Sequence, residues 1–194
     1  MTRSSITTDL AWCPGCPRHP RTFVDTPDDE MTELRRTAVR VVLADAAGQI
    51  LLLHVVEPKY PELGDCGELS GGGIDPGEDL FMAAQRELAE ETGLRVPITD
   101  IATPSWFRSV TFLHAGARRV QDEAIAYAAI PGLGPPVQAT ALSADENEIY
   151  LGYRWWAVDD IESSDVRFFP TSLPRVLRQF LAGKRIEEPF ERFS

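Results

Sequence analysis

The feature that most constrains this chain is a short acidic segment, RELAEETG, at residues 86–93. Asp79 is a typical helix N-cap, the final glycine is a typical helix stop, and apolar residues recur between them at helical spacing. In such a helix Glu87 faces both Glu90 and Glu91, and like charges at these spacings destabilise a helix. The segment therefore predicts either a solvated acidic face or, where a cation neutralises the charge, a metal site.

Glycines precede this helix in a defined arrangement. Residues 71–73 are all glycine, and residues 75–77 predict a turn just before Glu78 at the helix start. Glycine has no Cβ atom, so the backbone there can bend sharply and lie close to a ligand. The spacing from Gly72 through Glu78 to Leu94 resembles the complete consensus box of the Nudix hydrolase family. This match favours a cation site over a solvated face.

The resemblance implies a fold and an activity. The implied fold is an α/β (α+β) one, a Nudix-type α/β/α sandwich with a mixed β-sheet. The implied activity is Mg²⁺-dependent hydrolysis of a diphosphate (pyrophosphate) linkage in a nucleoside diphosphate linked to another moiety, with Mn²⁺ as a substitute metal. The sequence after the box carries no marker for ADP-ribose, coenzyme A, NADH or dinucleoside polyphosphates, so the substrate stays open.

The resemblance also assigns roles to residues of the box. Mg²⁺ takes oxygen ligands from carboxylates, phosphates and water, and it would neutralise a diphosphate that a carboxylate cluster otherwise repels. We expect metal ligands at Glu87, Glu90 and Glu91. Glu78 is expected to bind metal or to stabilise the positive end of the helix, and Arg86 to orient Glu87. Substrate contacts are expected at Gly71, Gly72 and Gly73.

The general base is less defined than the metal ligands, because Nudix enzymes take it either from the box or from a later loop. Glu91 is the candidate within the box, and Glu123, Glu146 and Glu148 are candidates outside it. We expect Glu148 rather than Glu146 to act as the base because it lies closer to a predicted strand that should bring this loop over the metal site. A solvated loop carboxylate is the alternative for each.

Strands and helices alternate irregularly along the chain, which favours a mixed sheet with helices packed on it. Two β-rich runs, 37–45 and 49–55, joined by residues 46–48, predict a hairpin. The remaining predicted elements are strands around 101–112, 119–130 and 153–158, a glycine- and proline-rich loop at 131–144, and a closing helix at 172–181.

Four aromatic residues are candidates for stacking on a nucleobase, although core packing is the more common role. These residues are Trp106, Phe107, Trp155 and Trp156. Adjacent residues of a strand point to opposite faces, so one of Trp155 and Trp156 should be buried and the other should face solvent, a partner or the pocket.

Composition limits the partners. A length of 194 residues suits one domain, and the formal net charge of -11 argues against broad attachment to nucleic-acid phosphates or anionic lipid. No apolar run is long enough to cross a bilayer, and the three cysteines fit a reducing compartment. We therefore expect a cytoplasmic protein that binds a small nucleotide-type substrate and neither nucleic acid nor membrane, with a homodimer left open.

The domain organisation follows from a change in hydrophobic periodicity near residue 34. Residues 1–33 predict an extension that is loosely ordered or packed on the domain, and residues 34–194 predict the Nudix domain. Within the extension, Cys13, Cys16 and His19 supply three zinc-type ligands without an evident fourth. We favour no chemistry for this group over zinc binding, and zinc binding over a redox role.

A second function of another class competes with catalysis. A Nudix fold that binds a nucleotide without turnover would be a sensor or an interaction module, because a fold does not fix a function. The full set of box carboxylates favours the enzyme.

Overall fold

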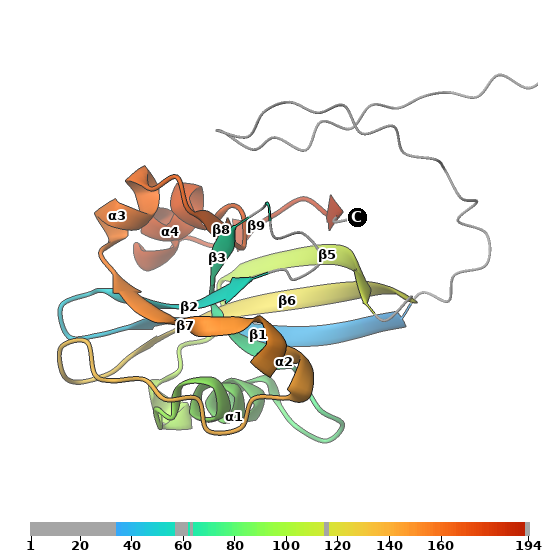
Figure 1. Cartoon of the computed structure of the whole chain (residues 1–194), viewed down its shortest axis with the longest axis horizontal. Coiled ribbons are helices and arrows are strands. Elements are labelled where there is room, and N and C mark those ends of the chain that lie inside the picture. Colours follow the sequence, from blue (N-terminus) through green and yellow to red (C-terminus); the bar gives the residue numbers. More distant parts are fainter. Residues whose placement is uncertain (1–33, 57–61, 63, 115–116, 193–194) are drawn as a thin grey trace, which may run out of the picture.

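The computed structural model describes residues 34–56, 62, 64–114 and 117–192, although not the side chains of residues 113, 114, 117 and 145. The extension with Cys13, Cys16 and His19 lies outside these ranges, so the expectations about it stay predictions. A curled, mixed sheet forms the middle layer of the domain (Figure 1). One helix, α1, covers one face of the sheet, and α3 and α4 cover the other (Figure 1).

The mixed character of the sheet comes from its strand pairing. Within the described residues the strand order is β10-β5-β6-β1-β2-β3-β8, with β4 paired to β1, β7 to β2 and β9 to β5. The β1–β6 pair is parallel, whereas β1–β2, β2–β3 and β5–β6 are antiparallel. The strands are β1 Leu34–Ala44, β2 Ile50–Val56, β3 Asp65–Glu68, β4 Ser70–Gly73, β5 Trp106–His114, β6 Ala117–Ala129, β7 Tyr150–Trp156, β8 Arg167–Phe169, β9 Ile186–Glu187 and β10 Glu191–Arg192.

The helices are α1 Leu80–Thr92, α2 Ala144–Ile149, α3 Val158–Ser163 and α4 Leu173–Leu181, with a 3₁₀ turn at Ile98–Asp100. None of the helices in the described ranges is both long and apolar enough to cross a membrane. The expected α/β/α sandwich with a mixed sheet is confirmed.

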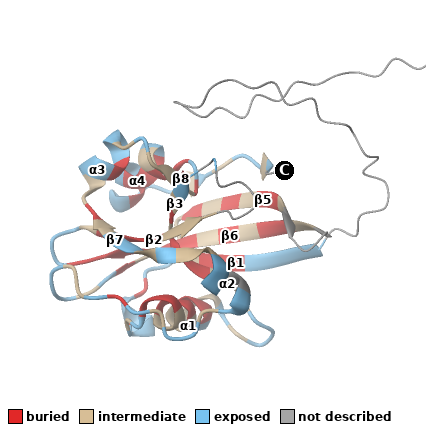
Figure 2. Cartoon of the chain, viewed as in Figure 1, coloured by how far each residue is buried: buried red, intermediate tan, exposed pale blue. Residues whose placement is uncertain are grey.

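Alternation along β1 explains why the sheet has a core on each face. Val42 packs in a cluster with Leu177 of α4, whereas Val41 packs in a second cluster with Leu88 of α1. Successive side chains of a strand point to opposite faces, so an apolar strand contributes side chains to the apolar clusters on both faces of the sheet. Figure 2 shows buried residues along the middle of the sheet and on the sides of α1 and α4 that meet it.

The predicted ends of the α1 helix are confirmed. The Asp79 carboxylate accepts a hydrogen bond from the backbone N–H of Met82 at 2.8 Å, and Gly93 takes the left-handed conformation at φ 70°. Glycine adopts that conformation without the strain that a Cβ atom would bring. The predicted hairpin is β1–β2.

Helix α2 lies where we expected a loop. Ser143 is its N-cap, and its hydroxyl accepts from the backbone N–H of Glu146 while the Glu146 carboxylate accepts from the backbone N–H of Ser143. This reciprocal capping stabilises a helix that is too short to show helical periodicity in the sequence.

Candidate active site

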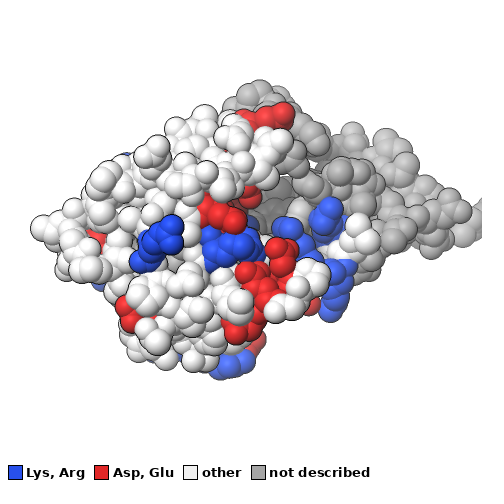
Figure 3. Space-filling model, turned by 90° about the horizontal axis from the view of Figure 1, so that it is seen from below, with Lys and Arg blue, Asp and Glu red and all other residues white. Residues whose placement is uncertain are grey.

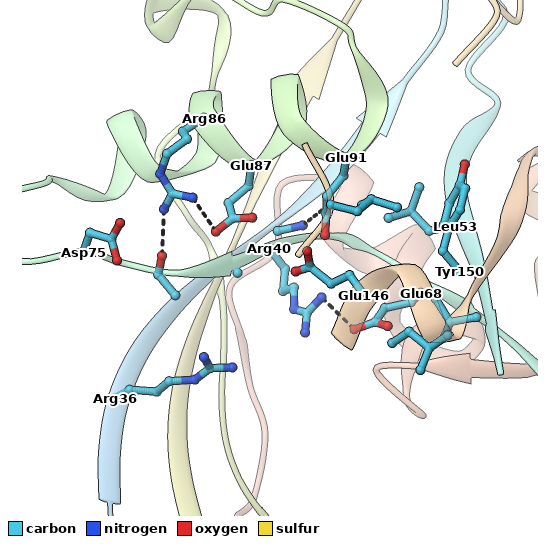
Figure 4. A pocket seen from close by; sticks show the side chains of 16 residues that line it. Arg36, Arg40, Leu53, Glu68, Asp75, Arg86, Glu87, Glu91, Glu146 and Tyr150 are labelled. Carbon is cyan, nitrogen blue, oxygen red and sulfur yellow. Dashed lines mark hydrogen bonds and ion pairs between the residues drawn. The ribbon is translucent and has the colours of Figure 1, made fainter. Parts of the chain in front are cut away.

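The carboxylates of α1 meet the glycine strand β4. Glu91 accepts hydrogen bonds on one oxygen from the backbone N–H of Gly71, at 2.8 Å, and from the Ser70 hydroxyl (Figure 4). A Cβ atom at Gly72 would overlap the Glu87 carboxylate, and one at Gly71 would overlap the backbone of β1. Glycine at position 71 is therefore needed for β4 to lie this close to β1, and glycine at position 72 leaves the space that the Glu87 carboxylate occupies.

Arg86 holds the acidic side of α1 together. Its guanidinium donates to both oxygens of Glu78, at 3.0 and 2.9 Å, and to the backbone carbonyl of Gly73 at 2.9 Å. The same group donates to Glu87 at 2.8 Å and to Glu90 at 3.2 Å. Hydrogen bonding from Arg86 lowers the pKa of Glu78. Arg86 thus contacts Glu87, as orientation of that carboxylate would require.

Burial changes the acid–base properties of two of these carboxylates. Glu87 and Glu91 are only 8% and 7% exposed. Burial raises the pKa of Glu91 to about 8, although the hydrogen bond from Ser70 and the charge of Arg40 oppose the shift. Burial also raises the pKa of Glu87, against the opposing effect of Arg86. A cation that replaced the lost solvation would favour the charged form of both groups.

A cavity of about 310 Å³ opens beside these carboxylates (Figure 4). Its lining combines acidic, basic and apolar side chains, and Figure 3 shows acidic and basic groups next to one another on the face of the molecule that carries α1. The acidic residues are Glu68, Asp75, Glu87, Glu91 and Glu146, the basic ones are Arg36, Arg40 and Arg86, and the others are Leu53, Val55, Gly71, Gly72, Gly73, Leu142, Ile149 and Tyr150.

Arg40 places a permanent positive charge inside this cavity. It projects from β1, and its guanidinium pairs with Glu68 at 2.7 Å and donates to the backbone carbonyl of Leu69 at 3.0 Å. Burial opposes its charged form, but the charges of Glu68, Glu123 and Glu91 raise its pKa above the ordinary value. Sequence reasoning missed Arg40 because it considered the box and later loops rather than the first strand.

The carboxylates proposed as general base fall in different places. Glu146 lines the cavity from α2, opposite the helix α1 carboxylates (Figure 4), whereas Glu148 is exposed and is absent from the lining. Glu123 is 2% exposed, pairs with Arg40 and Arg108 at 3.4 Å each, and lines a second, smaller cavity. Of the candidates outside the box, Glu146 is therefore the best placed, and our expectation of Glu148 over Glu146 has no support in this geometry.

The aromatic candidates also lie away from the main cavity. Trp106 and Trp156 are buried in the core. Burial of one residue of the Trp155–Trp156 pair is what the alternation of side chains along a strand predicted. The ring N–H of Trp155 donates to the backbone carbonyl of Pro135 at 3.0 Å. Phe107 lines the second cavity. The aromatic residue in the main cavity is Tyr150, at the junction of α2 and β7.

Comparison with known proteins identifies the family. The NUDIX domain family matches residues 34–179. The chain belongs to the Nudix family. Membership makes it a hydrolase that acts on diphosphate bonds.

Relatives of known name support this assignment. An RNA pyrophosphohydrolase of Caulobacter vibrioides is 30% identical over 173 residues, which is 84% of this Nudix chain and 97% of that protein. An RNA pyrophosphohydrolase of Dinoroseobacter shibae is 38% identical over 85 residues, 43% of this chain and 51% of that protein, so this second alignment spans about half of the relative.

Solved structures support the Nudix fold. A binary complex of the C. elegans Ap4A hydrolase superimposes with a TM-score of 0.50 at 24% identity, covering 76% of this chain and 98% of that one. The MutT protein of Bacillus halodurans gives a TM-score of 0.53 at 16% identity, covering 78% and 85%. At these identities the likeness concerns the fold alone.

The donor set of this Nudix site fits a hard divalent cation in its chemistry. Carboxylate oxygens of Glu87, Glu91 and Glu146 border one cavity, and such oxygens are the protein ligands that Mg²⁺ prefers. Among the described residues no three acidic, histidine or cysteine side chains already converge as a metal centre. Glu90, which is absent from the lining, and Glu87 instead pair with Arg86, so a cation would have to compete with that guanidinium.

Proposed function

We propose that this Nudix protein catalyses Mg²⁺-dependent hydrolysis of a diphosphate linkage in a nucleoside diphosphate linked to another moiety. The observation that carries the proposal is the meeting of α1 with β4, where buried Glu87 and Glu91 lie against Gly71 and Gly72 beside an open cavity. Glu87 pairs with Arg86 and Glu91 lies near Arg40, yet burial still raises the pKa of both carboxyls, so their placement supports a cationic ligand as part of the working site.

The cavity offers acidic groups to the metal cation and a basic group to the phosphate oxygens of the substrate. When bound, Mg²⁺ would be held by Glu87 and Glu91, with Glu90 and Glu78 close by, and would supply charge neutralisation and activation of water. Arg40 offers a fixed positive charge to phosphate oxygens, and its ion pairs with Glu68 and Glu123 keep it in place. The backbone of Gly71, Gly72 and Gly73 gives a substrate close approach to these groups.

The proton of the attacking water needs an acceptor that reaches the cavity. We propose Glu146 for this role because it lines the cavity from the side opposite α1. Its helix is short and begins at an exposed N-cap, so the side chain can exchange its capping hydrogen bond for a bond to water. Glu91, with its pKa raised by burial, is the alternative within the box.

The names of the relatives favour one class of substrate. Two relatives are RNA pyrophosphohydrolases, so the 5′ end of an RNA is a candidate beside small nucleotides. Such a substrate is compatible with the net charge of -11, because one RNA end needs a local site rather than a broad basic surface.

A turnover screen tests the proposal. Nucleoside diphosphate derivatives, nucleoside triphosphates and an RNA with a 5′-triphosphate would be incubated with the protein, with and without Mg²⁺, and the released phosphate or pyrophosphate measured. Release that requires Mg²⁺ and is lost in Glu91→Gln supports the enzyme. Tight binding of a nucleotide with no product from any compound would contradict the proposed enzyme and favour a nucleotide-binding sensor.

A further inference from the structure

The main cavity has chemically different ends. In Figure 4 Arg36 lies at one end, Leu53 and Tyr150 lie at the other, and the carboxylates of Glu87 and Glu146 lie between them. The diphosphate and metal of the proposed reaction belong in the acidic middle. The two ends are left for the parts of the substrate on either side of the bond that is cleaved.

Two arginines lie near the basic end: Arg36 lines the cavity, and Arg119, which is not among the lining residues, lies close to it on β6. Arg36 donates from Nε to the side-chain oxygen of Gln121, and the Nε atom of Arg119 is buried without a hydrogen-bond partner. In the parallel β1–β6 ladder Arg36 pairs with Gln121, and Arg119 lies two residues earlier on the same face of β6. The two side chains therefore project from neighbouring strands on one side of the sheet.

The electrostatics of Arg36 agree with this placement. Desolvation lowers the pKa of Arg36, and the nearby positive charges of Arg40 and Arg119 lower it further. Arg40 is compensated by Glu68 and Glu123, whereas Arg36 and Arg119 have no ion pair among the described residues. The charges of Glu123 and Glu87 act in the opposite direction, and Arg36 is exposed to solvent, so the repulsion between the arginines is partly offset. An anion bound between them would reduce the repulsion further.

The opposite end is apolar. Leu53 lies there beside Tyr150 in Figure 4, and Leu142 and Ile149 also line the cavity. An aromatic ring beside aliphatic side chains suits the face of a nucleobase, because every base can stack and release water from both surfaces. It does not suit a phosphate, which would lose its hydration there.

We propose that the cavity binds a nucleotide in one orientation, with the nucleoside against Tyr150 and a phosphate beyond the cleaved linkage held by Arg36 and Arg119. This inference rests on the proposed function and adds a preference for a chain of at least three phosphates. Two phosphates fill the middle of the cavity, and a third reaches the arginines. Arg36 and Arg119 are binding residues in this arrangement and take no part in proton transfer.

Equilibrium binding of inorganic polyphosphates tests the basic end without any turnover. Isothermal titration calorimetry would compare tripolyphosphate with pyrophosphate, in the absence and presence of Mg²⁺. The parent should bind tripolyphosphate more tightly. Arg36→Gln and Arg119→Gln should each weaken tripolyphosphate binding about tenfold to hundredfold, as expected for a lost charge-assisted hydrogen bond, and change pyrophosphate binding little.

Arg35→Gln is the matched control. Arg35 neighbours Arg36 on β1 but points to the other face, where it is exposed and pairs with Asp122 at 3.4 Å. Its loss removes the same charge without touching the cavity. Arg36→Lys should keep part of the affinity. Equal losses for Arg35→Gln and Arg36→Gln, or no loss in Arg36→Gln or in Arg119→Gln, would overturn the subsite.

The apolar end has its own test. Tyr150→Ala should weaken binding of a nucleoside triphosphate about tenfold while leaving inorganic tripolyphosphate unchanged. Tyr153→Ala, which alters a tyrosine outside the cavity lining, should change neither. The reverse pattern, with Tyr150 affecting inorganic tripolyphosphate, would contradict the orientation. If these affinities hold but the turnover screen yields no product, the proposed function fails and the subsite stands.

Discussion

Glu91 combines two properties that a site for a cation would use: it is buried, and one of its oxygens already accepts hydrogen bonds from Ser70 and Gly71. The nearby charge of Arg40 favours the ionised carboxylate but would repel a cation. The hydrogen bonds fix the orientation of the carboxylate. Burial nevertheless disfavours its charged form in the metal-free protein, because two hydrogen bonds do not replace full hydration.

We predict that the metal-free protein becomes less stable as pH rises. Burial raises the pKa of Glu91 in the folded state to about 8, above its ordinary value of 4.5, so the folded protein holds a proton that the unfolded chain has released. This stabilisation is present at low pH and is lost as pH rises through about 8. Melting temperatures in EDTA should therefore fall from about pH 5 to pH 8, and Glu91→Gln should flatten the profile. The same slope in parent and variant would contradict the assignment.

Gly72 provides a second test of the close contact. Its Cβ would overlap the Glu87 carboxylate, so Gly72→Ala should displace that side chain and lower kcat by roughly tenfold to hundredfold. If Gly72→Ala turns over at the parental rate, close contact between β4 and Glu87 does not matter for catalysis.

The elements differ in how far the sequence could predict them. The α1 helix has an N-cap at Asp79, a terminating glycine at Gly93 and the Nudix consensus box along its length, so both of its ends could be predicted from neighbouring residues in the sequence. Helix α2 is short, and its capping residues Ser143 and Glu146 lie in a stretch that resembles a polar loop. The pairing of β1 with β6 joins residues far apart in the chain, so the position of Arg119 beside Arg36 could not be derived from sequence spacing.

Helix α2 carries a prediction about the general base. Glu146→Gln should lower kcat roughly a hundredfold to ten-thousandfold while Mg²⁺ affinity stays nearly the same, as loss of a general base requires. Glutamine can still accept the capping hydrogen bond from Ser143, so the helix should remain. Glu148→Gln, on the exposed side of the helix, serves as the control. Parental turnover in Glu146→Gln would transfer the role to Glu91.

The domain as a unit is held by buried charge as well as by its two apolar cores. Glu191 of β10 pairs with buried Arg108 at 2.5 Å, Arg108 approaches Glu123, and Glu123 pairs with Arg40 in the cavity. Each charge in this series has an opposite neighbour, as burial demands. The series connects the C-terminal strand to the main cavity, and no sequence pattern indicated it because its members come from four separate strands.

The extension at residues 1–33 should be dispensable for the domain. A chain that begins at residue 31 keeps β1 complete, so we predict an unchanged melting temperature and an unchanged rate of hydrolysis. Differential scanning fluorimetry and the turnover assay check this result. Loss of folding, or stoichiometric zinc in the full-length protein, would show instead that Cys13, Cys16 and His19 form a structural site.

The central claim is that the carboxylates of α1 bind the catalytic cation, and a Mg²⁺ titration of the melting temperature tests it most directly. A ligand that binds only the folded state stabilises it by mass action, so the melting temperature of the parent should rise with Mg²⁺ concentration. The double variant Glu90→Gln and Glu91→Gln should fold without metal and lose this rise, whereas Glu148→Gln should keep it. An equal rise in the parent and the double variant would place the cation elsewhere and contradict the account.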